Sequence, residues 1–176
     1  MSKRFLITGL PRMRSAWLAA LFSSEDVKCF HDLTMSGGKL TFFRALSDAS
    51  AKVVGLCDPC AACLYPRDAL ELFRGHPVVI VQRSEKDSLA GLTKWAGQEP
   101  ADWDATMRNY TWFKDRVHAN MLWVPFHDLD DFDVVSELYS LCTVGMRLDK
   151  HRFELFNSLK IEQHRDKAAA AYSGVT

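Results

Sequence analysis

The chain has no excess of charge of either sign and no long hydrophobic run. Its 176 residues include 22 Lys and Arg and 22 Asp and Glu, so its formal net charge is zero. Without a global field, any anion site must be local, and nothing in the composition attracts nucleic acid. No apolar stretch is long enough to cross a bilayer, and no signal peptide precedes the first predicted strand. We therefore expect neither a membrane nor a nucleic-acid partner.

Cysteine is also scarce, and its number is odd. The chain has five cysteines, and without a secretory signal we expect them to be reduced thiols in a cytoplasmic protein. Cys57, Cys60 and Cys63 have C-x₂-C-x₂-C spacing, which resembles the start of an iron–sulfur motif. A cluster or zinc site usually needs a fourth matched ligand, and only Cys29 or Cys142, if folded close, would supply one. The spacing also suits small hydrophobic side chains at a strand end, so we expect no metal.

Apolar strand patterns alternate with helical patterns along the chain. Strands covered on both faces are continuous apolar runs, as residues 77–82 are. This alternation predicts an α/β fold with three α/β/α layers and a mainly parallel central sheet. We expect one domain over residues 1–162 and a flexible tail over 163–176. Strands are expected at 4–9, 27–30, 52–56, 77–82 and 121–125. Helices are expected at 14–24, 39–49, 65–74, 85–96, 101–119, 131–143 and 148–160, with a turn at Gly37-Gly38.

The first predicted strand leads into an arginine-bearing loop and then a helix. Residues 9–15 read Gly-Leu-Pro-Arg-Met-Arg-Ser. A loop that brings backbone N–H groups to a helix N-terminus forms an anion site. Guanidinium groups, such as those of Arg12 and Arg14, suit phosphate or sulfate. The nucleoside-triphosphate loop reads G-x-x-x-x-G-K-[ST]; here Met13 stands for the second Gly and Arg14 for the Lys. The alternative is an ordinary strand-to-helix turn with surface arginines.

Three stretches, in order, give the chain a resemblance to the sulfotransferase-type P-loop family, of which it looks like a small, divergent member. Residues 11–18 read Pro-Arg-Met-Arg-Ser-Ala-Trp-Leu, where the family has roughly Pro-Lys/Arg-Ser-Gly-Thr-Thr-Trp-Leu. Residues 80–87 read Ile-Val-Gln-Arg-Ser-Glu-Lys-Asp, similar to a strand that ends in Arg-[Asn/Asp]-Pro-x-Asp. Residues 123–129 read Trp-Val-Pro-Phe-His-Asp-Leu, similar to a strand followed by Tyr-Glu-Asp-Leu. The resemblance implies a P-loop, sulfotransferase-like form of the α/β/α fold.

The resemblance implies that the chain binds 3′-phosphoadenosine 5′-phosphosulfate and transfers its sulfuryl group to an acceptor hydroxyl, which the sequence does not identify. In the family, the first motif holds the 5′-phosphosulfate and the second binds the 3′-phosphate. The family's serine eight residues after the arginine falls at Gly91, so Ser84 or Ser88 would replace it. A C-terminal Arg-Lys-Gly element of the family is missing. The donor-binding residues implied are Pro11, Arg12, Met13, Arg14, Ser15, Ala16, Arg83, Ser88 and Trp95, the last stacking on the adenine ring.

Arg12 and His31 are the catalytic residues that the resemblance implies. Arg12 lies where the family has a basic catalytic residue, and it would neutralise the leaving phosphate. His31 follows the second predicted strand, and histidine is the usual general base near neutral pH. Asp32 or Asp58 would orient His31 or take its place. The alternative is that His31 is a strand-end histidine with no catalytic role.

Alternatives stay open for other residues and for the chain as a whole. The alternative to a donor-binding role for Arg83 is that of a surface arginine paired with Glu85. The aromatic side chains of residues 95–113 are expected in the core. Asp128 is a candidate partner for an arginine of the first loop. The alternatives to sulfuryl transfer are a catalytically degenerate nucleotide-binding or interaction protein with the same fold, and a variant P-loop kinase that would need Mg²⁺.

Overall fold

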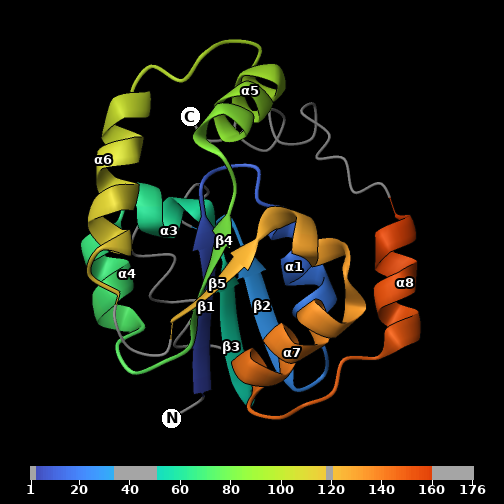
Figure 1. The fold of residues 1–176 in the computed structure, drawn as a ribbon. Helices are drawn as coiled ribbons and strands as arrows, with labels where there is room; N and C mark the ends of the chain where they lie inside the picture. Colours follow the sequence, from blue (N-terminus) through green and yellow to red (C-terminus); the bar gives the residue numbers. More distant parts are fainter. Residues whose placement is uncertain (1–2, 34–50, 118–120, 160–176) are drawn as a thin grey trace, which may run out of the picture.

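The computed structural model describes residues 3–33, 51–117 and 121–159, and these form a sheet with helices on both faces (Figure 1). The sheet has five strands in the order β2-β3-β1-β4-β5, and all neighbouring strands are parallel. Their register places Ile7 beside both Cys57 and Val79. The strands are β1 (Lys3–Gly9), β2 (Val27–His31), β3 (Val53–Cys57), β4 (Val78–Gln82) and β5 (Met121–Pro125).

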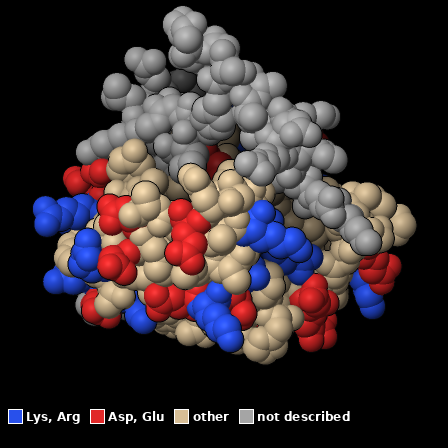
Figure 2. All heavy atoms as spheres, turned by 90° about the horizontal axis from the view of Figure 1, so that it is seen from above, with Lys and Arg blue, Asp and Glu red and all other residues tan. Residues whose placement is uncertain are grey.

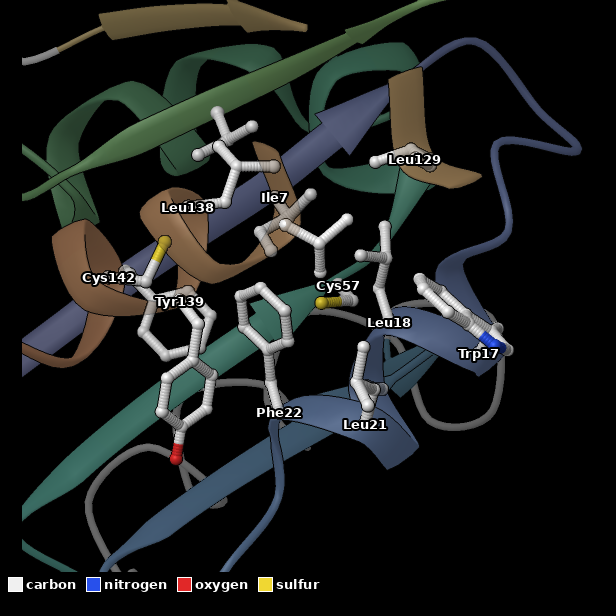
Figure 3. Close-up of a cluster of buried hydrophobic side chains, with 14 of the residues drawn as sticks. Ile7, Trp17, Leu18, Leu21, Phe22, Cys57, Leu129, Leu138, Tyr139 and Cys142 are labelled. Atoms are coloured by element: carbon white, nitrogen blue, oxygen red, sulfur yellow. The ribbon is translucent and has the colours of Figure 1, made fainter. Parts of the chain in front are cut away.

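The central strands are apolar because both of their faces are covered. In β1, Phe5 and Ile7 point into one core and Leu6 points into the other. The first core lies between the sheet and one group of helices, and Figure 3 shows part of it. That group contains α1 (Ser15–Phe22), α7 (Phe132–Thr143) and α8 (Lys150–Ser158). The second core lies under α3 (Pro59–Cys63), α4 (Pro66–Leu72) and α6 (Trp103–Lys114).

Two further elements lie where strands end. The helix α5 (Glu85–Ala96) follows β4 and sits beyond the carboxyl ends of the strands, at the top of Figure 1. The short 3₁₀ helix η1 (Phe126–Asp130) follows β5. No helix among the described residues has the length and apolar character that crossing a membrane requires.

Short polar side chains start most of the longer helices. Ser84 accepts a hydrogen bond from the backbone N–H of Asp87, and the Ser84 hydroxyl donates to the Asp87 carboxylate, so the start of α5 is fully capped. Asp102, Asp131 and Asp149 accept backbone N–H bonds at the starts of α6, α7 and α8. Asp87 therefore takes part in the cap of α5.

The fold prediction is confirmed, with differences at the ends of elements. Each strand begins and ends within one residue of its predicted bounds. The helix expected at 14–24 begins at Ser15 because Arg14 is left-handed, and the helix expected at 101–119 ends at Lys114. The elements α3 and η1 were not predicted. The predicted turn at Gly37-Gly38, the helix at 39–49 and the tail at 163–176 lie outside the described residues, and the assignment of a single domain stays a prediction.

Candidate functional site

Because the strands are parallel, their carboxyl ends meet at one edge of the sheet, where open α/β sheets bind ligands. The loop over residues 10–14 leaves β1 at this edge, while His31 ends β2, Asp58 follows β3 and Arg83 follows β4. Figure 2 looks down on this edge, and basic and acidic side chains are mixed over the part not drawn in grey. The described part of this face therefore carries no patch of one sign.

The loop after β1 has an unusual backbone. Arg12 (φ 69°) and Arg14 (φ 65°) are both left-handed, and Met13 between them has negative φ. Alternation of handedness turns successive N–H groups toward a common centre, which is the concave anion-binding arrangement of phosphate loops. A left-handed residue other than glycine costs about 1–3 kcal/mol and is concentrated at functional sites. Two of them in one loop show that the fold holds this shape against local preference.

Met13 occupies the space beneath the loop. Its side chain is fully buried in the core below α1. Gly9 makes this possible, because a Cβ there would lie 2.5 Å from the Val81 carbonyl oxygen and 3.1 Å from the Met13 sulfur. The methionine therefore points down into the core and supports the loop from below.

Arg14 points toward η1 and α8. Its guanidinium donates to Asp130 at 2.6 Å and to the side-chain oxygen of Asn157 at 3.0 Å, and it lies 4.0 Å from the centre of the Trp17 ring. These contacts fix the left-handed backbone of Arg14. The acidic partner of Arg14 is thus Asp130 and not Asp128, which contacts His127 at 3.1 Å.

Arg83 connects the two motifs that the sequence singled out. Its guanidinium donates to the backbone carbonyl of Arg12 and lies 4.5 Å from the centre of the Phe126 ring. Burial lowers the pKa of Arg83, and the positive charge of Arg12 lowers it further, while Asp87 acts in the opposite direction. Two cationic side chains thus share a small space, which an anion would stabilise.

Gly91 on α5 makes that close approach possible. A Cβ at this position would lie 3.3 Å from Arg12 Cγ and 3.7 Å from Arg83 Nη2. The family's serine falls here, so the chain has replaced a hydroxyl with room for two arginine side chains. The sequence alone shows the glycine but does not show what fills the space.

Ser88 and Trp95 lie on the same face of α5 as Gly91, since they are one turn before it and one turn after it. The Ser88 side chain is fully buried, and its hydroxyl has no hydrogen-bond partner among the described residues. The indole N–H of Trp95 is likewise buried without a partner in the described part of the chain. Buried polar groups are normally paired, so these two donors make this face of α5 a candidate part of the site.

His31 is held beside the start of α1. Its Nε2 lies 3.0 Å from the Ser15 hydroxyl and 3.1 Å from the Asp32 carboxylate. Burial lowers the pKa of His31, and the negative charge of Asp58 opposes this only in part. His31 is therefore mainly neutral at about pH 7, the state in which an imidazole accepts a proton. Asp58 itself caps α3 by accepting the N–H of Cys60 at 2.8 Å.

The cysteines at 57, 60 and 63 have separate surroundings. Cys57 lies against Cys29, whereas Cys63 lies 3.7 Å from the carbonyl oxygen of Gly9. Within the described residues, no group of three or more His, Cys, Asp or Glu could hold a metal ion.

The aromatic residues of α6 divide between core and surface. Tyr110 and Phe113 are buried under the sheet, whereas Trp112 lies between Arg67 and Arg116. Trp103 donates to Glu85 at 3.0 Å and joins α6 to α5. A pairing of Arg83 with Glu85 was the alternative from the sequence. Instead, Glu85 contacts Trp103, while Arg83 contacts the Arg12 carbonyl and the Phe126 ring. Core packing accounts for part of the aromatic stretch, as expected.

Comparison with known proteins gives a match in structure alone. No protein-family model matches the sequence, and no curated protein does. A sulfotransferase from Alicyclobacillus acidocaldarius has a similar structure, with a TM-score of 0.59 at 12% identity over 99% of this chain and 92% of that one. The mouse sulfotransferase SULT7A1, solved as a complex with PAP, has a TM-score of 0.57 at 12% identity over 89% of this chain and 63% of that one. The resemblance seen in the sequence is confirmed as a structural similarity, and the chain has a sulfotransferase-like fold.

Proposed function

We propose that the protein binds 3′-phosphoadenosine 5′-phosphosulfate at the carboxyl edge of the sheet and transfers the sulfuryl group to an acceptor hydroxyl. The observation that carries this proposal is the meeting of the two motifs: Arg83 donates to the carbonyl of Arg12, and both side chains pack at Gly91. The loop, which would bind one anionic group, thereby lies beside a second cationic side chain. A nucleotide with phosphate groups on both the 3′ and the 5′ oxygen of its ribose suits such a pair of positions.

The residues divide by the part of the donor that they would hold. The loop N–H groups of Arg12, Met13 and Arg14, with those of Ser15 and Ala16 at the start of α1, would bind the 5′-phosphosulfate. Pro11 fixes the approach of the loop by its restricted φ. Arg83 and the unpaired Ser88 hydroxyl would bind the 3′-phosphate, and the indole of Trp95 would meet the adenine. Arg14 acts through its contacts with Asp130 and Asn157, which hold the loop in shape.

The chemistry is an in-line displacement at sulfur. The acceptor oxygen forms a bond to sulfur while the bond from sulfur to the bridging phosphate oxygen breaks, so negative charge collects on the leaving phosphate. Arg12 and the loop amides would stabilise that charge. His31 would take the proton of the acceptor hydroxyl, because it is neutral near pH 7 and lies 3.0 Å from Ser15 at the loop. Asp32 would hold the resulting imidazolium.

Thermal unfolding in the presence of three nucleotides tests the binding proposal. We expect adenosine 3′,5′-bisphosphate to raise Tm, with adenosine 5′-monophosphate weaker because it lacks the 3′-phosphate that Arg83 would hold. ATP with Mg²⁺ represents the kinase alternative. Equal stabilisation by the monophosphate and the bisphosphate would contradict the two-site assignment, and a response to ATP–Mg²⁺ alone would favour the kinase.

A nucleotide-binding protein that transfers nothing is the second candidate. The observation that favours it is the hydrogen bond between the Ser15 hydroxyl and His31, because this bond engages both the loop hydroxyl and the proposed base. Transfer of radiolabelled sulfate from the donor to a panel of hydroxyl acceptors separates the two candidates. We expect transfer by the wild type and its loss in His31→Ala with bisphosphate binding kept. Binding without transfer to any acceptor would support the second candidate.

A further inference from the structure

Two cysteines on neighbouring strands lie in sulfur contact. Cys29 of β2 and Cys57 of β3 have their Sγ atoms 3.3 Å apart. In the parallel register Cys29 lies beside Gly55, so Cys29 and Cys57 point to the same face, one diagonal step apart. Gly55 contributes no side chain to this face, and the ring of Phe5 occupies the place where its Cβ would lie.

The geometry points to a modification site at this pair: a reversible disulfide between Cys29 and Cys57, formed by a peroxide. Cys29 is partly exposed, whereas Cys57 is fully buried, so an oxidant reaches Cys29 first. The Cys29 sulfur attacks one peroxide oxygen, the O–O bond breaks, and Cys29 becomes a sulfenic acid with release of one water. The Cys57 sulfur then attacks the Cys29 sulfur, the S–O bond breaks, and a second water leaves. Two thiols have lost two protons and two electrons, and the peroxide has taken up both.

The distance between the two sulfur atoms favours a disulfide at this pair. A disulfide needs the sulfurs to close to about 2.05 Å, a movement of little more than one ångström from their present contact. Burial raises the pKa of Cys57, as does its hydrogen bond with Cys29, so Cys57 does not make the first attack on the peroxide. Cys142 lies in the same core as Cys57 (Figure 3), but among the described residues the sulfur contact of Cys29 is with Cys57. A metal site is not supported within the described residues.

The two cysteines lie close in sequence to two residues at the carboxyl edge of the sheet. Cys29 is two residues before His31, and Cys57 directly precedes Asp58. The cross-link would join the two strand ends that carry these side chains, below the loop after β1. The chemistry of the pair does not depend on the proposed function, so its test stands alone.

Peptide mapping of the full-length protein tests the site. The reduced protein is treated with an equivalent of hydrogen peroxide, free thiols are alkylated, and the chain is cut with trypsin. We expect two of the five thiols to be lost, with residues 29–39 linked to residues 53–67. Because residues 53–67 contain three cysteines, fragment ions must place the bond at Cys57. Dithiothreitol should restore both thiols.

Variants give the matched controls. Cys29→Ser and Cys57→Ser should abolish the linked peptide, whereas Cys60→Ser, at another partly exposed cysteine, and Cys142→Ser should keep it. In Cys57→Ser, dimedone should trap the sulfenic acid of Cys29. A link to Cys60, Cys63 or Cys142 instead, direct conversion of Cys29 to a sulfonic acid, or retention of all five thiols in the wild type would overturn the assignment. Wild-type mapping decides this even if a variant fails to fold.

Discussion

Arg83→Gln removes the charge that joins the two halves of the proposed site while keeping a polar side chain. In the wild type this arginine donates to the carbonyl of Arg12 and lies 4.5 Å from the centre of the Phe126 ring. A hydrogen bond from a charged group contributes about 1.5–3 kcal/mol when buried, and an exposed cation–π contact contributes about 0.5–1 kcal/mol. Removing one guanidinium relieves its repulsion with Arg12, so we expect a net loss of stability of only about 1 kcal/mol.

The effect on binding should be larger than the effect on stability. A charge-assisted contact between Arg83 and the 3′-phosphate is expected to contribute about 2–3 kcal/mol. Its loss corresponds to a dissociation constant about 30–150 times higher. Calorimetric titration with adenosine 3′,5′-bisphosphate measures this directly, and thermal unfolding measures the stability term, which we expect to lower Tm by about 2–4 °C.

Arg116→Gln is the matched control. Arg116 also lies 4.5 Å from the centre of an aromatic ring, that of Trp112, and it also donates to a backbone carbonyl, at 3.2 Å. It lies at the other end of the sheet, beside the start of β4, where it lines a cavity of about 280 Å³ together with Gly75 and Val78. The variant should lose similar stability and keep bisphosphate affinity. If both variants bind the bisphosphate as tightly as the wild type, the assignment of Arg83 is refuted.

Three further predictions concern the loop and its surroundings. Met13→Ala should lower the free energy of unfolding by about 2–5 kcal/mol, because Met13 is fully buried beneath the loop; a loss below about 1 kcal/mol in denaturant unfolding would show that the side chain is not packed as described. Arg14→Gly relieves a left-handed backbone but loses the contacts with Asp130, Asn157 and Trp17. It should therefore lower the free energy of unfolding in denaturant, and a gain in stability would contradict the anchoring role. For His31, burial lowers the folded-state pKa, so the unfolded chain binds the proton more readily, and the free energy of unfolding should fall as pH drops below about 6.5. His31→Gln should flatten this part of the curve, and an unchanged slope in His31→Gln would exclude His31 as its source.

The sequence was sufficient for the type and order of most elements along the chain because its strands are apolar and its helix starts are polar. Residues 78–82 could only be a buried strand, and Ser84, Asp102 and Asp131 each mark a helix start by a capping side chain. The short elements α3 and η1 were not predicted from the sequence because five-residue helices have too few turns to show periodicity.

The site was only partly predictable, because orientation is decided by contacts that are distant in sequence. The motif pattern identified Arg12, Arg14 and Arg83, but not that Arg14 turns toward Asp130, more than 100 residues away. The pattern also showed that Met13 replaces a small residue, but whether its bulk fills the loop or the core depends on Gly9 and Val81. Contact between Cys29 and Cys57 follows from strand order, which the sequence did not give.

Titration of the isotope-labelled protein with adenosine 3′,5′-bisphosphate, followed through its backbone amide resonances, tests the central claim most directly. The left-handed geometry at Arg12 and Arg14 predicts that the amides of residues 12–16 shift together and saturate, with those of Arg83 and Ser88 following the same isotherm. Shifts confined to the cavity beside Arg116, or no saturable shift in the loop at millimolar nucleotide, would contradict the account.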